Sequence, residues 1–114
     1  MKSWDSLKKN EDFSRVYRTG KSFANKYLVM YMVENHREEN RFGISVSKKV
    51  GNSVVRHHIT RLLREGYRLN IAGFEKGYDI VVVARQSAKG RSFQEIESAL
   101  LHLNKIHKKK MGKS

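Results

Sequence analysis

The segment from Lys48 to Arg68 constrains the fold most, because its apolar residues recur at the spacing of a helix that must bury one side. At about 100° per residue, a single arc of this helix contains Val55, Ile59, Leu62, Leu63 and Leu69. Gly51 lets the backbone turn just before the helix, and Asn52 or Ser53 is placed to accept hydrogen bonds from its first amides. The pattern therefore predicts a helix that lies on a sheet.

The opposite face of this helix is predicted to be basic. Spacings of four, three and four residues stack the side chains of His57, Arg61, Arg64 and Arg68. The whole segment holds six Lys or Arg and two His side chains against one acid, Glu65. A row of cations with so little opposing charge is typical of a surface that binds nucleic acid, and the simpler alternative is a solvated basic face.

The charge of the whole chain favours a polyanionic partner. The sequence has 24 Lys or Arg against 11 Asp or Glu, a formal charge of +13. A membrane surface is the rival polyanion, but no apolar run approaches the roughly 20 residues that span a bilayer, and the N-terminus lacks the apolar segment of a signal peptide. We therefore expect one domain over residues 1–114, in the cytoplasm and away from membranes. The lack of cysteine fits a reducing compartment.

Periodicity outside this helix predicts further elements. Asn10 is expected to cap a helix over 11–19 that ends at Gly20, and a helix after the capping box of Ser92 and Glu95 continues past Ile106 into a basic tail at 108–114. Strands are expected at 27–33, 41–47 and 79–84, with a loop over 34–40. In the strand at 41–47, small residues (Gly43, Ser45 and Ser47) share one face and leave room for a ligand.

The resulting order, α-β-β-α-β-α, predicts an α+β fold. We expect a small two-layer sandwich of a mixed central sheet, with helices on one face and the other face available for binding. A β-α-β crossover is expected to join the strands at 41–47 and 79–84, and the sequence does not fix its hand.

The acids and histidines do not form a catalytic or metal-binding pattern. Acids are scattered, and the pairs Glu11–Asp12 and Glu38–Glu39 fit a helix start and a solvated loop. His102 and His107 would lie about 140° apart on a helix, and adjacent His57 and His58 about 100° apart. We therefore predict no catalytic residue and no metal site in the protein itself.

The string SKKVGNSVVRHHITRLLRE, from Ser47 to Glu65, resembles the signature of the bacterial ribonuclease P protein component. Further motifs occur in the order and spacing of that family: LKKNEDF at 7–13, G-x-S-x-A-N at 20–25, RFGISVSKK at 41–49 and DIVVVAR at 79–85. One position differs in kind. Where the family has Arg-Asn-Arg, this chain has Arg56-His57-His58, so imidazoles replace an amide and a guanidinium.

The resemblance implies a fold like domain 2 of ribosomal protein S5 and a role as the non-catalytic protein subunit of ribonuclease P. That ribonucleoprotein is an endonuclease which removes the 5′ leader of precursor tRNA, and its RNA subunit hydrolyses the phosphodiester with Mg²⁺ that the RNA mainly holds. The implied partners are the catalytic RNA and precursor tRNA, with no protein partner required. No metal ion is expected to bind the protein alone.

Two RNA-binding surfaces are predicted. The first is expected to grip the catalytic RNA and comprises Lys48, Lys49, Asn52, Arg56, His57, His58, Arg61, Arg64 and Arg68. The second is a cleft for the single-stranded leader, which the resemblance implies, with Phe13, Tyr17, Tyr31 and Arg85 as candidates. The simpler alternative for Phe13 and Tyr17 is a place in the core. Rival functions are a general RNA-binding protein or ribosomal-type chaperone, and a DNA-binding module.

Overall fold

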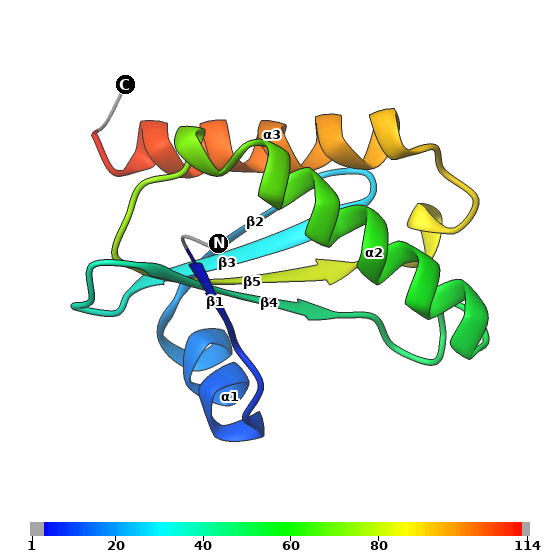
Figure 1. The fold of residues 1–114 in the computed structure, drawn as a ribbon, viewed down its shortest axis with the longest axis horizontal. Coiled ribbons are helices and arrows are strands. Elements are labelled where there is room, and N and C mark those ends of the chain that lie inside the picture. The colour runs from blue at the N-terminus through cyan, green and yellow to red at the C-terminus, as the bar shows by residue number, and fades with distance from the viewer. Residues whose placement is uncertain (1–3, 113–114) are drawn as a thin grey trace.

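The computed structural model describes residues 4–112 and places them in a five-stranded sheet with helices on both faces (Figure 1). The strands are β1 (Trp4–Ser6), β2 (Lys21–Ala24), β3 (Leu28–Glu34), β4 (Asn40–Ser45) and β5 (Tyr78–Ala84). The helices are α1 (Asn10–Thr19), α2 (Ser53–Leu69) and α3 (Phe93–Lys110), with short 3-10 turns at Ile71–Gly73 and Gln86–Ala88.

The sheet is mixed and has the strand order β1-β4-β5-β3-β2. β1, β4 and β5 run parallel, whereas β3 is antiparallel to both β5 and β2. Because β4 and β5 are parallel neighbours joined through α2, the predicted β-α-β crossover is confirmed, as are the α+β class and the mixed sheet. The sequence does not predict β1 and β2, because three and four residues are too few to show an alternating pattern.

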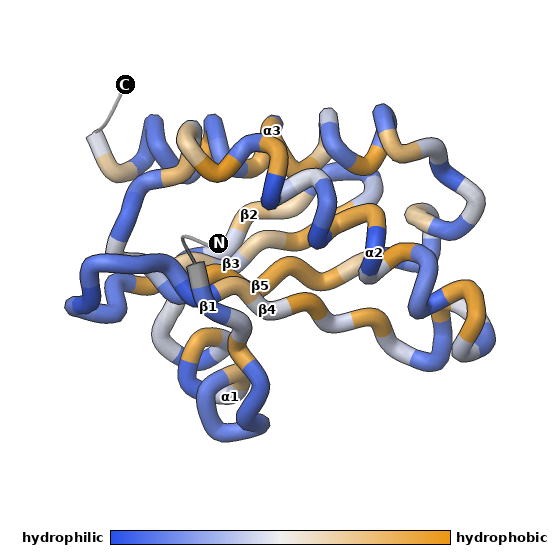
Figure 2. Tube along the Cα trace, in the orientation of Figure 1, coloured by the Kyte–Doolittle hydropathy of each residue, from blue (hydrophilic) through white to orange (hydrophobic). Residues whose placement is uncertain are grey.

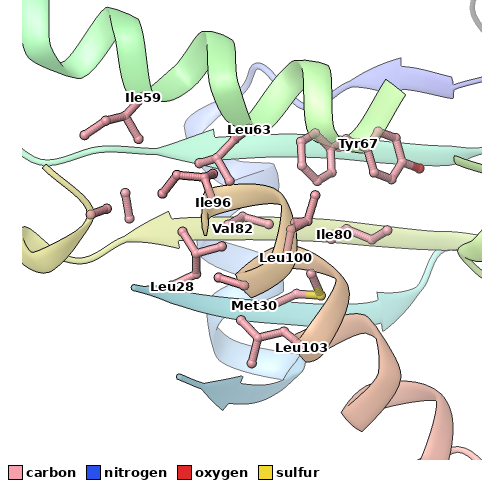
Figure 3. Close-up of a cluster of buried hydrophobic side chains, with 14 of the residues drawn as sticks. Leu28, Met30, Ile59, Leu63, Tyr67, Ile80, Val82, Ile96, Leu100 and Leu103 are labelled. Carbon is pink, nitrogen blue, oxygen red and sulfur yellow. The ribbon is translucent and has the colours of Figure 1, made fainter. Parts of the chain in front are cut away.

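The main core lies between the sheet and the pair α2 and α3. The central strands are the most apolar part of the chain (Figure 2), and their side chains meet those of both helices (Figure 3). The fully buried members from the two helices are Ile59, Leu63, Tyr67, Ile96, Leu100 and Leu103. Each buried side chain of this size contributes about 1.5–3 kcal/mol to stability, so this layer holds α2 firmly in place.

The apolar stripe of α2 differs from the prediction at its C-terminal end. Leu69 is wrong as a core residue, because 53% of its surface is exposed. Tyr67, four residues after Leu63, continues the stripe instead, and its ring stacks on Phe42 with 4.1 Å between centroids. Asn40 donates a hydrogen bond to the Tyr67 hydroxyl, which satisfies the polar end of this buried ring.

The predicted starts of α2 and α3 are confirmed, as is the predicted end of α1 at Gly20, but the predicted cap of α1 is wrong. The Asn52 side chain accepts a hydrogen bond from the Val55 amide, and Ser92 and Glu95 form the capping box. At α1, however, Lys9 occupies the cap position without a side-chain bond, and Asn10 is the first helical residue. The basic tail also begins later than predicted, because 108–110 form the last turn of α3.

α1 packs on the sheet face opposite α2 and α3, so the expectation that helices cover a single face is wrong (Figure 1). Val16 of α1 is fully buried against Leu7 and Val81. The small face predicted at 43–47 is not a single ligand space: at Gly43 an added Cβ would lie 2.7 Å from Cζ of Phe13. Gly43 therefore makes room for α1, and only the part of the sheet beyond α1 is left for binding.

Candidate nucleic-acid interface

The basic face of α2, defined by His57, Arg61, Arg64 and Arg68, is exposed as predicted. The opposite side of the helix is fixed in the core through Ile59, Leu63 and Tyr67, so the helix cannot rotate these cations inward. Among residues 4–112, neither Arg61 nor Arg64 forms an ion pair. Both guanidinium groups are therefore available to an external anion.

Arg68 is engaged within the protein. Its Nε and Nη2 donate to the two Glu65 carboxylate oxygens at 2.9 Å and 2.7 Å. The hydrogen bonds from Arg68 lower the pKa of Glu65, so the carboxylate stays charged. The single acid of this segment thus neutralises one end of the basic face, and the available charge is concentrated at Arg61 and Arg64.

The loop before α2 is built by backbone contacts that also fix Arg56. Val50 is buried, and its backbone amide donates a hydrogen bond to the Ser47 carbonyl, which closes a turn. Lys48 and Lys49, within this turn, are exposed. Arg56 is half-buried, and its Nε donates to the Gly51 carbonyl at 3.2 Å. Asn52 serves as the helix cap. Among the predicted contacts, Arg56 and Asn52 therefore hold the loop in shape, whereas the two lysines project from it.

An open strip of sheet lies beside α1. The strand registers align Ser45 of β4, Val83 of β5, Val29 of β3 and Ala24 of β2 in one row across the sheet. None of these four side chains belongs to the α2–α3 face, since their neighbours Ile44, Val82, Met30 and Phe23 pack there. The strip is lined by Ser, Val and Ala side chains, and of these four residues the sequence predicted only Ser45 for this face.

Aromatic rings from α1 and β3 border the open strip. Tyr17 contacts Tyr31 edge to face at 4.9 Å between centroids, and Phe13 lies 6.4 Å from Tyr17. Tyr17 is 38% exposed, whereas Phe13 is partly buried over Gly43. The structure therefore brings three of the predicted cleft residues together, but Phe13 and Tyr17 differ in exposure. Phe13 mainly packs against the sheet, whereas the Tyr17 ring is exposed to solvent.

The fourth predicted cleft residue, Arg85, follows β5 at the same end of the sheet as Lys48 and Lys49. β4 and β5 are parallel, so their C-terminal ends lie together. Nη1 of the exposed Arg85 donates to the Asn25 carbonyl at 2.8 Å, which directs the side chain toward the β2–β3 turn. The C-terminal ends of β4 and β5 lie at the same end of the sheet as the start of α2 (Figure 1), so Arg85 follows β5 at the end of the open strip.

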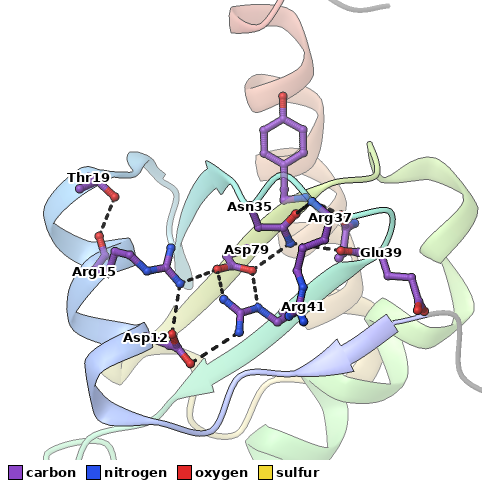
Figure 4. Close-up of polar contacts among 10 residues, drawn as sticks. Asp12, Arg15, Thr19, Asn35, Arg37, Glu39, Arg41 and Asp79 are labelled. Carbon is purple, nitrogen blue, oxygen red and sulfur yellow. Dashed lines mark hydrogen bonds and ion pairs between the residues drawn. The ribbon is translucent and has the colours of Figure 1, made fainter.

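An ion network around a buried carboxylate, which the sequence did not predict, joins α1 to the sheet (Figure 4). Asp79 of β5 is fully buried and accepts hydrogen bonds from Arg41 at 2.8 Å and 2.7 Å, from Arg15 at 2.8 Å and from Asn35 at 3.0 Å. Asp12 of α1 pairs with both arginines. We call this set, Asp12, Arg15, Asn35, Arg41 and Asp79, the Asp79 network.

The Asp79 network keeps its central carboxylate ionised. Burial, the largest influence, raises the pKa of Asp79, but the hydrogen bonds from Arg41, Arg15 and Asn35 together outweigh it and bring the pKa to about 2. Arg15 is on the same helix as Phe13 and Tyr17, so this network fixes the helix that borders the open strip. The available sequence signal was an acid at the start of a strand that is otherwise continuously apolar.

The histidines are distributed as follows. His57 and His58 are exposed on α2, whereas His107 is buried and its Nε2 donates to the Met30 carbonyl at 2.8 Å. Burial lowers the pKa of His107.

Across residues 4–112, no three His, Asp or Glu side chains gather as a metal-binding group. Within the same range, no helix has the length and apolar character needed to cross a membrane.

The fold and this surface define a class: a single-domain α+β protein with a cationic helix face, and an open strip of sheet bordered by aromatic rings. A model of the ribonuclease P family matches residues 1–108. The chain belongs to this family, as its motifs predict.

Individual relatives agree over most of their length. The ribonuclease P protein component of Lachnoclostridium phytofermentans is 62% identical over 104 residues, which cover 91% of this chain and 90% of the relative. A solved Staphylococcus aureus RNase P protein is 42% identical, with a TM-score of 0.84 over 90% of this chain and 94% of that one. The Thermotoga maritima RNase P protein is 33% identical, with a TM-score of 0.82 over 90% and 96% of the two chains.

Proposed function

We propose that this protein is the protein subunit of ribonuclease P and that it binds the catalytic RNA through the basic face of α2. The observation that carries this proposal is the pair Arg61 and Arg64, which are exposed, form no ion pair within residues 4–112 and lie on a helix whose other side is buried. Guanidinium groups bind phosphate with paired N–H donors, and each phosphate contact releases counterions. Lys48 and Lys49 extend the same charge beyond the helix start. We propose that the protein acts in the cytoplasm.

The open strip is proposed to bind the 5′ leader of precursor tRNA. An unpaired strand can lie along the row of Ser, Val and Ala side chains with a base against the exposed Tyr17 ring. Arg85, Lys48 and Lys49 at the end of the strip supply phosphate contacts.

The protein is proposed to be the non-catalytic component, with Mg²⁺ held mainly by the RNA subunit. Three carboxylates near the two surfaces already have partners: Asp12 and Asp79 pair with arginines, and Glu65 pairs with Arg68. A metal-dependent phosphodiesterase needs convergent carboxylates that are open to the metal. When Mg²⁺ is bound by the RNA it activates the attacking water, and this chain's residues position the two RNAs.

Reconstitution with the cognate catalytic RNA at low Mg²⁺ tests this function, by following release of the leader from precursor tRNA. Stimulation of cleavage supports the proposal. Binding of many RNAs without stimulation indicates a general RNA chaperone, and equal competition by duplex DNA indicates a DNA-binding module. One Staphylococcus aureus structure is that of an RNase P protein mutant with defective mRNA degradation activity. The isolated protein should therefore also be incubated with mRNA, and cleavage there would contradict a non-catalytic role.

Tyr17→Ala is expected to weaken binding of precursor tRNA to the holoenzyme by about 1–2 kcal/mol, because it removes the exposed ring beside the open strip. Binding of mature tRNA, which lacks a leader, should be unchanged. Tyr17→Phe is the matched control, since it keeps the ring. Comparing the two dissociation constants checks this prediction, and an equal loss with both tRNAs would assign Tyr17 to packing alone.

A further inference from the structure

A second groove lies outside the two surfaces described above. It has a volume of about 610 Å³ and runs between the β2–β3 turn and the first half of α3. Its lining includes Lys26, Tyr27, Glu95, Ser98, Ala99 and His102. The α1 side of the sheet, with the open strip, faces away from α3, so this groove is separate from the strip.

The groove is a defined structure because Asn25 ties its two sides together. The Asn25 Oδ1 accepts hydrogen bonds from the amides of Tyr27 and Leu28, at 3.2 Å and 3.0 Å. Its Nδ2 must then be the donor, and it donates to the Ala99 carbonyl at 2.9 Å and to Nδ1 of His102 at 3.2 Å. Asn25 closes the G-x-S-x-A-N motif, which thus joins the turn to α3.

These hydrogen bonds also fix the tautomer of neutral His102. Because Nδ1 accepts from Asn25, the proton of the neutral ring is on Nε2. His102 is exposed on the groove, so it can offer Nε2–H as a donor to an oxygen or ring nitrogen of a ligand.

The chemistry of the groove matches single-stranded RNA. Lys26 Nζ and Arg91 Cζ lie 5.6 Å and 5.9 Å from the centroid of the Tyr27 ring, so two cations flank one aromatic side chain. Glu95 is the negative charge beside these cations. Its carboxylate accepts a hydrogen bond from the Ser92 amide and lies 3.7 Å from the Arg91 guanidinium group, so it is partly neutralised. Aromatic rings beside cations bind unpaired nucleotides without strict sequence preference.

The groove begins where the open strip ends. Ala24 is the last strip residue on β2, and the next three residues, 25–27, form the turn and line the groove. The Arg85 side chain donates a hydrogen bond to the Asn25 carbonyl, and the Ser87 hydroxyl donates one to the Lys26 carbonyl. The residues after β5, at the end of the strip, are therefore hydrogen-bonded to the β2–β3 turn. Figure 1 shows the β2–β3 turn, the end of β5 and the start of α2 at one end of the sheet.

We propose that this groove binds the upstream part of the precursor-tRNA leader, after the leader has crossed the open strip and passed around the β2–β3 turn. The proposal rests on the function proposed above. It assigns phosphate contacts to Lys26 and Arg91, and a nucleobase or sugar contact to His102. If the groove binds the leader in this way, the affinity that the protein adds to precursor-tRNA binding depends on the length of the leader.

The test compares two precursor tRNAs in the reconstituted holoenzyme, one with a leader of about 4 nucleotides and one of about 10, a range that spans a single-strand site. The wild-type protein should bind the longer leader more tightly. Lys26→Ala should remove about fivefold of that affinity, the size of one exposed charge contact, and Lys26→Ala with His102→Ala should remove more. Both variants should bind the short leader as the wild type does. Lys76→Ala, an exposed lysine in the loop before β5, is the matched control.

Each outcome has a definite meaning. A length effect that survives in both variants overturns the groove and leaves the function proposed for the open strip intact. Equal losses with both leader lengths also overturn the groove, because the substitutions then act elsewhere. A wild-type protein that adds no affinity for any leader overturns the leader-binding function and the groove together. Crosslinking from a thiouridine in the upstream half of the leader to the α3 peptide containing His102 would support the proposal directly.

Discussion

Asp79→Asn is expected to lower the free energy of unfolding by about 2–3 kcal/mol near neutral pH, the size expected for a buried carboxylate whose cationic partners retain some contact with water. Asp79 is fully buried, while the side chains of Arg15 and Arg41 are 34% and 21% exposed. An asparagine keeps the shape but not the charge, so both guanidinium groups lose the negative charge at position 79, while Asp12 remains as a charged partner. Urea unfolding of both proteins at pH 7 measures the difference.

The difference between the two proteins should shrink as the pH falls. The pKa of Asp79 is lowered from 3.8 to about 2 in the folded state, so the unfolded chain takes up a proton first. The stabilisation is therefore complete above about pH 5 and is lost as the pH falls toward 2. Glu38→Gln, at an exposed position in the β3–β4 loop, is the matched control and should show little difference at any pH. A constant gap between wild type and Asp79→Asn from pH 7 to pH 2.5 would contradict the ionised network.

The same substitution should separate the two RNA-binding surfaces. The Asp79 network holds α1, whereas α2 is held by the apolar core on the other face of the sheet. At a temperature where the variant is still folded, it should bind precursor tRNA more weakly and the catalytic RNA normally. Equal weakening for both RNAs would indicate a general loss of folded protein rather than a displaced helix.

Parts of this architecture follow directly from the sequence, and the rest depend on contacts between distant residues. The face of α2 was predictable because Ile59 and Leu63 and the cations opposite them obey a single helical period. The side of the sheet on which α1 lies was not, since Val16 marks a buried stripe without saying what covers it. That answer requires the pairing of Arg15 with Asp79, 64 residues away in the sequence.

The binding strip shows the same limit. Alternation in β4 placed Ser45 on the correct face, but the row that joins it to Val83, Val29 and Ala24 exists only through the registers of three strand pairs. Asn25 is similar, because its motif was recognised but its role depends on contacts with Ala99 and His102. Residue types thus predicted which chemistry is present, and long-range pairing determined where it acts.

Arg61→Ala with Arg64→Ala is expected to weaken binding to the catalytic RNA by about tenfold to thirtyfold near 0.1 M salt, as for two phosphate contacts of about 1 kcal/mol each. The slope of log affinity against log salt concentration should become shallower by about two, because each lost phosphate contact releases about one fewer counterion on binding. Stability should change little, since both side chains are exposed and unpaired within residues 4–112. Filter binding over a series of salt concentrations measures both quantities.

Two comparisons make this prediction specific to the basic face. Arg37→Ala with Lys76→Ala removes the same charge from exposed loops before β4 and β5, and should leave the salt slope nearly unchanged. Glu65→Gln removes the internal partner of Arg68 and should tighten binding, because that guanidinium then becomes available to phosphate. If the two arginine substitutions act no more strongly than the loop substitutions, the attraction comes from the net charge of +13 and not from the arrangement of α2.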